Sequence, residues 1–158
     1  FNEGWGQYDA DRIYTEMKAY DPTRVWDATS GWFKQKMSDV ESEHIYFKPL
    51  KLKNDGRPLV LSEFGGYSYK PEGHVFNTEK TYGYGKFEDQ TAFAEAVEKL
   101  YREQVIPAAE NGLCAAIYTQ VSDVEDEING FLTYDRKVNK ADEAAMLAIA
   151  EELKKAIL

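Results

Sequence analysis

Cysteine is nearly absent from this chain of 158 residues. Cys114 is the only one, which excludes an internal disulfide and leaves the compartment open. Basic residues are also few, with 19 Lys and Arg against 28 Asp and Glu and a formal net charge of −9. Nucleic acids and anionic membranes bind basic patches, so this balance argues against both and favours an uncharged or cationic ligand. We find no signal-peptide pattern and no apolar run long enough to span a membrane.

Apolar residues make up 43% of the sequence, enough for a sizeable core, and the length suits one domain over residues 1–158. Cys114 lies in an apolar run, which predicts a small core residue. The chain opens at Phe1 inside a motif rather than at Met, so we expect a piece of a longer protein. Eleven Tyr and three Trp exceed what a core of this size needs, and sugar sites use such rings as platforms.

The segment Pro58–Gly66 organises the rest of the sequence. Its apolar run from Leu59 predicts a buried parallel strand, and Glu63 follows directly. Gly65 and Gly66 then predict a sharp turn that would let a ligand approach the backbone. An acid at the carboxyl end of a parallel strand stands where α/β proteins place their chemistry, although a solvated Glu before a glycine turn would look the same.

The remaining pattern predicts β/α units on a mostly parallel sheet, that is, an α/β fold. Residues 1–3 are expected to be the last residues of a strand, and further strands are expected at 24–28, 43–47 and 113–118. Helices are expected after Asp9, over 87–110 and from Asn139. Pro107 is expected to bend or fray the last turn of the long helix. The run after Gly66 to Lys86 shows no periodicity and predicts a functional or mobile loop.

Glu3 and Glu63 each stand at an expected strand end beside glycine. Two such carboxyl groups suit glycosidic bond cleavage, in which one protonates the leaving oxygen and the other attacks or activates water. Asn2, next to Glu3, could donate a hydrogen bond to a sugar hydroxyl.

Three motifs carry a resemblance to a known family. They are Phe-Asn-Glu-Gly-Trp-Gly-Gln at 1–7, Leu-Ser-Glu-Phe-Gly-Gly at 61–66, and the stretch from Tyr118 through Asn129-Gly130 to Arg136. Their order and spacing resemble the catalytic barrel of glycoside hydrolase family 2, the β-galactosidase and β-glucuronidase group, over essentially the whole chain.

The resemblance implies the C-terminal half of a (β/α)8 TIM barrel, with strands five to eight and the end of strand four. It also implies a retaining β-glycosidase, most simply a β-galactosidase, with Glu3 as acid/base and Glu63 as nucleophile. Asn2 would bind the hydroxyl at sugar carbon two. Tyr46 would hydrogen-bond the nucleophile, unless it is a core aromatic, and for His44 a structural role competes with substrate binding.

One departure from the family concerns the sugar platform after strand eight. Many relatives have a tryptophan where this chain has Tyr118-Thr119-Gln120, so Tyr118 is the substrate-binding candidate there. Trp5 and Trp32 are alternatives, whereas Trp26 lies in an expected strand and suits the core.

Acidic residues cluster in the loop that follows, at Asp123, Glu125, Asp126 and Glu127. They lack the spacing of a calcium loop, and we expect them to be solvated or paired with Arg. No metal and no cofactor is expected.

The larger departure is what is missing. The first three strands, most of the fourth and the β-sandwich domains of the family would be partners supplied by the parent chain. We expect self-association through open sheet edges and little activity from the chain alone. The rival interpretation is a non-catalytic β/α domain that binds carbohydrate or protein.

Overall fold

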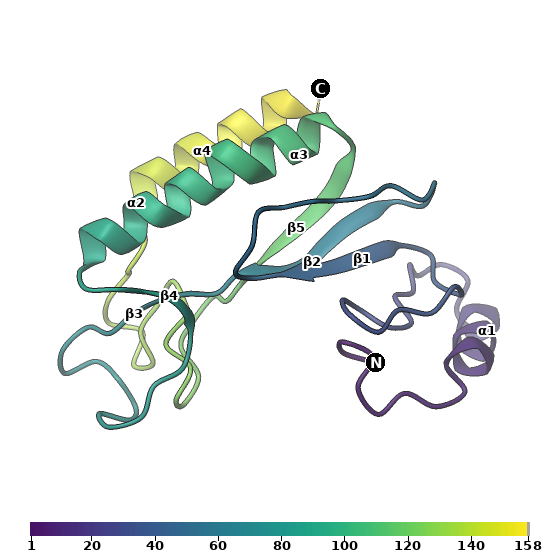
Figure 1. Cartoon of the computed structure of the whole chain (residues 1–158), viewed down its shortest axis with the longest axis horizontal. Coiled ribbons are helices and arrows are strands. Elements are labelled where there is room, and N and C mark those ends of the chain that lie inside the picture. The colour runs from purple at the N-terminus through teal and green to yellow at the C-terminus, as the bar shows by residue number, and fades with distance from the viewer. Residues whose placement is uncertain (158) are drawn as a thin grey trace.

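A parallel three-stranded sheet forms the centre of the computed structural model, which describes residues 1–157 (Figure 1). The strands are β1 (Glu41–Ile45), β2 (Leu59–Gly65) and β5 (Leu113–Thr119), in the order β1-β2-β5. Both pairings are parallel, so the C-terminal ends of the three strands lie together at one end of the sheet. The α/β class and the three strands expected from sequence are confirmed, with β1 two residues earlier than expected.

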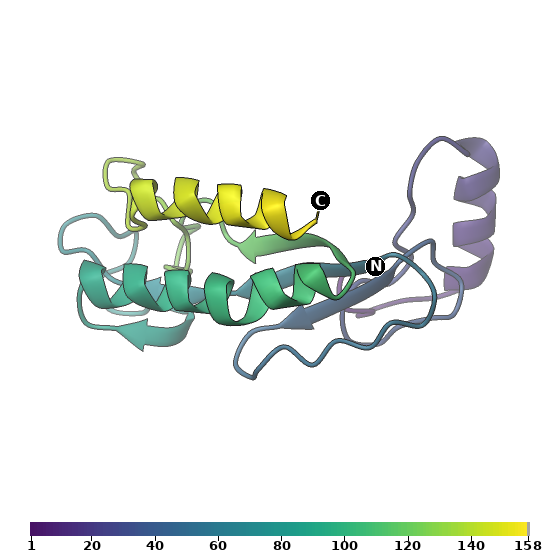
Figure 2. The same ribbon diagram turned by 90° about the horizontal axis from the view of Figure 1, so that it is seen from above.

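Helices cover one face of this sheet (Figure 2). A continuous helical rod consists of α2 (Gln90–Leu100), a π-helical turn (Tyr101–Val105) and α3 (Ile106–Glu110), and α4 (Glu143–Ala156) lies beside it. Asp89 and Asp142 cap α2 and α4 by accepting hydrogen bonds from Ala92 N and Ala145 N. The sequence placed the start of α4 at Asn139, which is wrong by four residues because Asp142 is the residue that caps the helix.

The rod changes its hydrogen bonding just before Pro107. Ile106 donates its N–H to the Tyr101 carbonyl five residues back, as in a π-helix. Proline has no N–H to donate and its ring crowds the carbonyl four residues earlier. The expected disturbance therefore takes the form of a π turn ahead of the proline, and the rod continues to Glu110.

The core lies between the helical layer and β2. Leu61, Phe64 and Phe93 are fully buried there, and Val97 and Ile149 are 1% exposed. These residues come from β2, α2 and α4, and the apolar faces expected of both helices account for this contact.

The opposite face of the sheet is covered less well, and β5 is an edge strand. Residues 114–117 of β5 are exposed, including Cys114, while Leu113 and Tyr118 at its ends are buried. The expectations of a buried strand and of a core cysteine here were wrong, because no strand among the described residues pairs with the outer edge of β5.

The N-terminal part lies at the far end of the molecule from the short strands β3 (Tyr67–Tyr69) and β4 (Tyr84–Phe87) (Figure 1). Helix α1 (Ala10–Tyr20) begins after Asp9 and stops at Asp21 as expected, but Tyr20 is 86% exposed and only Ala10 is buried. Residues 24–28 form no strand. The chain start could pair with this segment, but it forms only one parallel bridge, between Asn2 and Ser30. One bridge is too short to make a β-ladder.

The sequence predicted a loop without regular structure after Gly66, and this prediction was wrong. The run contains β3 (Tyr67–Tyr69) and β4 (Tyr84–Phe87), which pair in parallel as a separate two-stranded sheet. Alternating Gly and Tyr hid this pairing, because glycine weakens any strand pattern. No helix among residues 1–157 combines the length and the apolar character that a bilayer span requires.

Candidate active site

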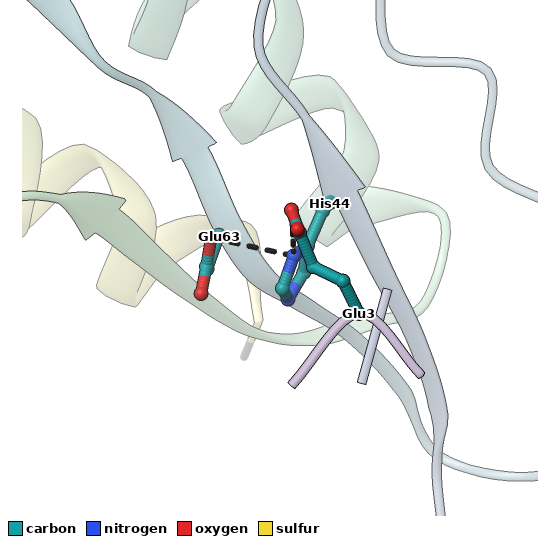
Figure 3. Close-up of side chains that lie close together, drawn as sticks. All are labelled: Glu3, His44 and Glu63. Atoms are coloured by element: carbon teal, nitrogen blue, oxygen red, sulfur yellow. Dashed lines mark hydrogen bonds and ion pairs between the residues drawn. The ribbon is translucent and has the colours of Figure 1, made fainter. Parts of the chain in front are cut away.

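Glu3, His44 and Glu63 meet near the C-terminal ends of the sheet strands (Figure 3). The Nδ1 atom of His44 lies 3.3 Å from Glu3 Oε1 and 3.3 Å from Glu63 Oε2. One donor atom from each of the three residues lies within 4.8 Å of the other two. Two carboxylates that are 60 residues apart in sequence thus share one histidine.

The strand register explains part of this meeting. His44 on β1 is paired with Glu63 on β2, just after an irregularity in the ladder between Glu43 and His44. Glu3 arrives from the chain start, where its backbone is left-handed with φ 53°. Its carbonyl accepts a hydrogen bond from Phe33 N at 3.1 Å, which ties the segment to the loop before β1.

Tyr46 holds Glu63 from the other side. Its hydroxyl donates a hydrogen bond to Glu63 Oε2 and lies 3.4 Å from Thr119 Oγ1. Burial raises the pKa of the Tyr46 hydroxyl, and the hydrogen bond to Glu63 raises it further. The phenol therefore remains protonated at neutral pH and acts as a donor to the carboxylate.

His44 is almost completely enclosed, with 1% of its side chain exposed. A Cβ on Gly31 would come within 2.5 Å of its ring, so glycine is required there for the ring to fit. Its Nε2 atom is buried and has no hydrogen-bond partner among the described residues. The imidazole thus directs its one engaged nitrogen at the two carboxylates.

Two more predicted residues lie beside Glu3. Trp5 is 63% exposed and donates its indole N–H to Glu3 Oε2 at 3.2 Å. Asn2 is exposed, and its Oδ1 is 3.4 Å from the Ser30 hydroxyl. Its amide group is therefore still open to a ligand.

Tyr118 lies apart from the carboxylates. It is 9% exposed, stacks on Phe131 at 4.2 Å and accepts a hydrogen bond from Tyr67 N through its hydroxyl. A Cβ on Gly65 would collide with its ring. Gly65 thus serves core packing, and Tyr118 stands in the core where the sequence suggested a ligand contact.

The acidic loop also differs from expectation at Asp123. This carboxylate is 1% exposed and accepts hydrogen bonds from Lys140 Nζ and Gly130 N, both at 2.8 Å. It is neither solvated nor paired with Arg. The lysine partner was missed because it lies 17 residues downstream, on a segment without a pattern of its own.

The donor set of Glu3, His44 and Glu63 is also of a type that binds divalent cations, with one imidazole nitrogen and two carboxylate oxygens. The carboxylates already accept hydrogen bonds from Trp5 and Tyr46.

A cavity of about 460 Å³ lies elsewhere, between 49–54 and the α3 end of the rod, and is lined by neither carboxylate.

Sequence reasoning missed Thr119 and Tyr84 at this site. Tyr84 stacks on Tyr46 with ring centroids 4.4 Å apart. The density of Gly and Tyr between Gly66 and Lys86 was the available signal.

No protein-family model matches the chain, and no curated protein matches its sequence.

Proposed function

We propose that the chain carries both catalytic carboxylates of a retaining β-glycosidase of the glycoside hydrolase family 2 type. The observation that supports this most is the pairing of Glu3 and Glu63, whose facing oxygens lie within 4.8 Å of each other. Retaining enzymes place their carboxyl groups about 5–5.5 Å apart, whereas inverting enzymes need about 6.5–9.5 Å to admit a water. Tyr46 adds a donor on Glu63 alone, which makes the two carboxylates chemically distinct.

In this proposal Glu63 is the nucleophile and Glu3 the acid/base. Glu63 attacks the anomeric carbon while the bond to the leaving oxygen breaks and Glu3 transfers its proton to that oxygen. Glu3, now a carboxylate, then takes a proton from water as the water oxygen displaces Glu63 from the sugar. The hydrogen bond from Tyr46 keeps Glu63 aimed at the sugar, and Asn2 is available for a sugar hydroxyl.

The finer fold belongs to the same proposal. The parallel order β1-β2-β5 with a helical layer on one face fits strands six to eight of a (β/α)8 barrel, with 24–28 as the remnant of strand five. The exposed middle of β5 would then pair with strand one of the parent chain. The partners of the chain would be the missing half-barrel, the preceding β-sandwich domains and a β-glycoside, most simply a β-galactoside.

The test is made on the parent enzyme with two single amide variants. Glu63→Gln should abolish turnover of every substrate, because an amide cannot form the glycosyl ester. Glu3→Gln should spare aryl glycosides with activated leaving groups, which need no protonation, and lose about 10²–10⁴-fold on a natural disaccharide.

Glu79→Gln is the matched control, since Glu79 is exposed and outside the site, and it should be unchanged. Equal losses of Glu3→Gln on both substrates would refute its role as acid. The alternative function, a non-catalytic carbohydrate-binding domain, predicts sugar binding with no turnover in any variant.

A further inference from the structure

The connection from β1 to β2 contains no helix, and the structure describes all of its residues, 46–58. Adjacent parallel strands are usually joined by a crossover that includes one. Figure 1 shows this connection as an extended trace that returns to the start of β2, and in Figure 2 it lies on the side of the rod that faces away from α4. Its middle part, residues 48–54, is here called the lysine segment.

Side chains of the lysine segment alternate between the protein and the solvent. Leu50 and Leu52 are half-buried, whereas Lys51 and Lys53 are exposed, which is the two-residue period of a strand with one covered face. Both leucines line the cavity of about 460 Å³ between this segment and the rod. The other apolar residues that line the cavity are Pro49, Leu59, Pro107 and Ala108.

The backbone of the lysine segment is held at one point only. Leu50 N donates a hydrogen bond to Gln104 Oε1 on the rod at 2.8 Å. Among the described residues, the backbone N–H and C=O groups of Lys51, Leu52 and Lys53 have no hydrogen-bond partner. An extended backbone with free N–H and C=O groups is a template for the addition of a further strand.

The charges of this segment are opposite in sign to those of the chain as a whole. Lys48, Lys51 and Lys53 lie within six residues of a chain with a net charge of −9, and none of them forms an ion pair among residues 1–157. Two copies of this segment would place lysine opposite lysine and repel each other. An acidic strand would instead form cross-strand ion pairs here.

The acids beside the lysine segment are engaged by other cations. Asp55 forms an ion pair with Arg57. Glu103, which lines the cavity from the rod, lies 4.0 Å from Lys99 Nζ. The lysines therefore remain available to the carboxylates of a partner.

We propose that the lysine segment binds an extended segment of another protein in which acidic and apolar residues alternate. The bound segment adds a strand beside residues 50–53. Its apolar side chains enter the cavity next to the two leucines, and its carboxylates lie opposite Lys51 and Lys53 on the outer face. This interaction is independent of the proposed glycosidase activity, because neither proposed catalytic glutamate lines the cavity.

The test is an NMR titration of the 158-residue chain with the end-blocked peptide Gly-Glu-Val-Glu-Leu-Glu-Gly. The amide signals of residues 50–53 should shift, and those amides that gain a partner should exchange more slowly with solvent. The peptide Gly-Lys-Val-Lys-Leu-Lys-Gly has the same apolar residues and the opposite charge, and it should bind about tenfold more weakly. Gly-Glu-Ser-Glu-Ser-Glu-Gly, which lacks the apolar residues, should also bind more weakly.

A charge-reversed variant tests the ion pairs directly. Lys51→Glu combined with Lys53→Glu should prefer the lysine peptide over the glutamate peptide by about tenfold, and this new preference would also show that the variant is folded. Lys36→Glu combined with Lys155→Glu is the matched control, since both lysines are exposed and neither lines the cavity. The control should keep the preference of the wild type.

The proposal is overturned if the wild type binds the two charged peptides equally, if the Lys51 and Lys53 variant keeps the wild-type preference, or if the affected amides lie outside residues 48–54. Vesicles of phosphatidylserine and phosphatidylcholine in equal amounts test the other anionic partner. Binding to these vesicles without binding to the glutamate peptide would also overturn the proposal, because the lysines would then serve a membrane surface.

Discussion

At the scale of single residues, the ion pair between Lys140 and Asp123 holds the loop after β5. Lys140 is fully buried and donates from Nζ to Asp123 and to the carbonyls of Ile128 and Tyr69. Burial lowers the pKa of Lys140 and raises the pKa of Asp123, while the contact between the two opposes both shifts. The pair thus joins the β5 loop to β3 at the cost of desolvating two charges.

Replacing only one partner of this ion pair should therefore lower the free energy of unfolding strongly. Lys140→Met leaves the Asp123 carboxylate buried without its cation, and we expect a loss of about 3–5 kcal/mol in the free energy of unfolding. Lys154→Met is the matched control, since the Lys154–Glu151 pair is exposed and its loss should cost less than about 1 kcal/mol. Urea unfolding compares the two, and similar small losses would show that the buried pair contributes no anchoring.

At the scale of elements, α1 is attached by polar contacts rather than by its apolar face. Tyr14 and Lys18 of α1 both donate to the Asp39 carboxylate, at 2.7 Å each, and Trp26 N donates to it at 2.8 Å. The bond from Lys18 lowers the pKa of Asp39 to about 2, and the bond from Tyr14 contributes next. One carboxylate thus joins the helix to the segment before β1.

This anchoring predicts a specific pH dependence. Because the pKa of Asp39 is lower in the folded chain than its ordinary value of 3.8, its stabilisation is complete above that value and is lost as the pH falls toward about 2. The difference in unfolding free energy between wild type and Asp39→Asn should be about 1–2 kcal/mol at pH 6, allowing for partial exposure, and should shrink between pH 5 and 3. A flat difference for Asp39→Asn across this pH range would contradict the assignment.

The elements also show what sequence can and cannot predict. The strand at Leu59 and the helix at Phe93 were predictable because an apolar run and a 3.6-residue period record burial directly. The segment 24–28 was also expected to be a strand but forms none, because a ladder needs a partner strand and that information is not local. Glu3 and Glu63 were singled out because each stands beside glycine at an expected strand end, although β2 continues through Glu63 to Gly65 and Glu3 lies outside any strand. The Tyr84 stack, by contrast, depends on packing against Gly66 and Tyr46.

At the scale of the whole molecule, the open edge at β5 is the main unsatisfied feature. Ile117 on this strand is 57% exposed, and unpaired N–H and C=O groups of an edge strand are a template for another chain. We expect a second copy to pair there, giving concentration-dependent association in sedimentation experiments. Ile117→Lys should weaken the association, whereas Val25→Lys, at an exposed apolar residue away from the sheet, should not. A monomer at all concentrations in the wild type would contradict this expectation.

The placement of Glu3 decides whether the chain can act by itself. Glu63 lies on a paired strand, but Glu3 is held by the Asn2–Ser30 bridge and a left-handed backbone, with no strand of its own. Catalysis requires both carboxylates and the sugar in attack geometry, and a misplacement of about 1 Å can cost about a hundredfold.

We therefore expect the 158-residue chain alone to hydrolyse aryl β-galactosides no faster than its own Glu63→Gln variant, which controls for contaminating host enzyme. The measurement is release of the aryl group by the two purified chains at equal concentration. Activity well above the Glu63→Gln control would contradict this expectation. It would mean that pairing of two copies across β5 rebuilds a working site, and Ile117→Lys should then abolish the activity together with the association.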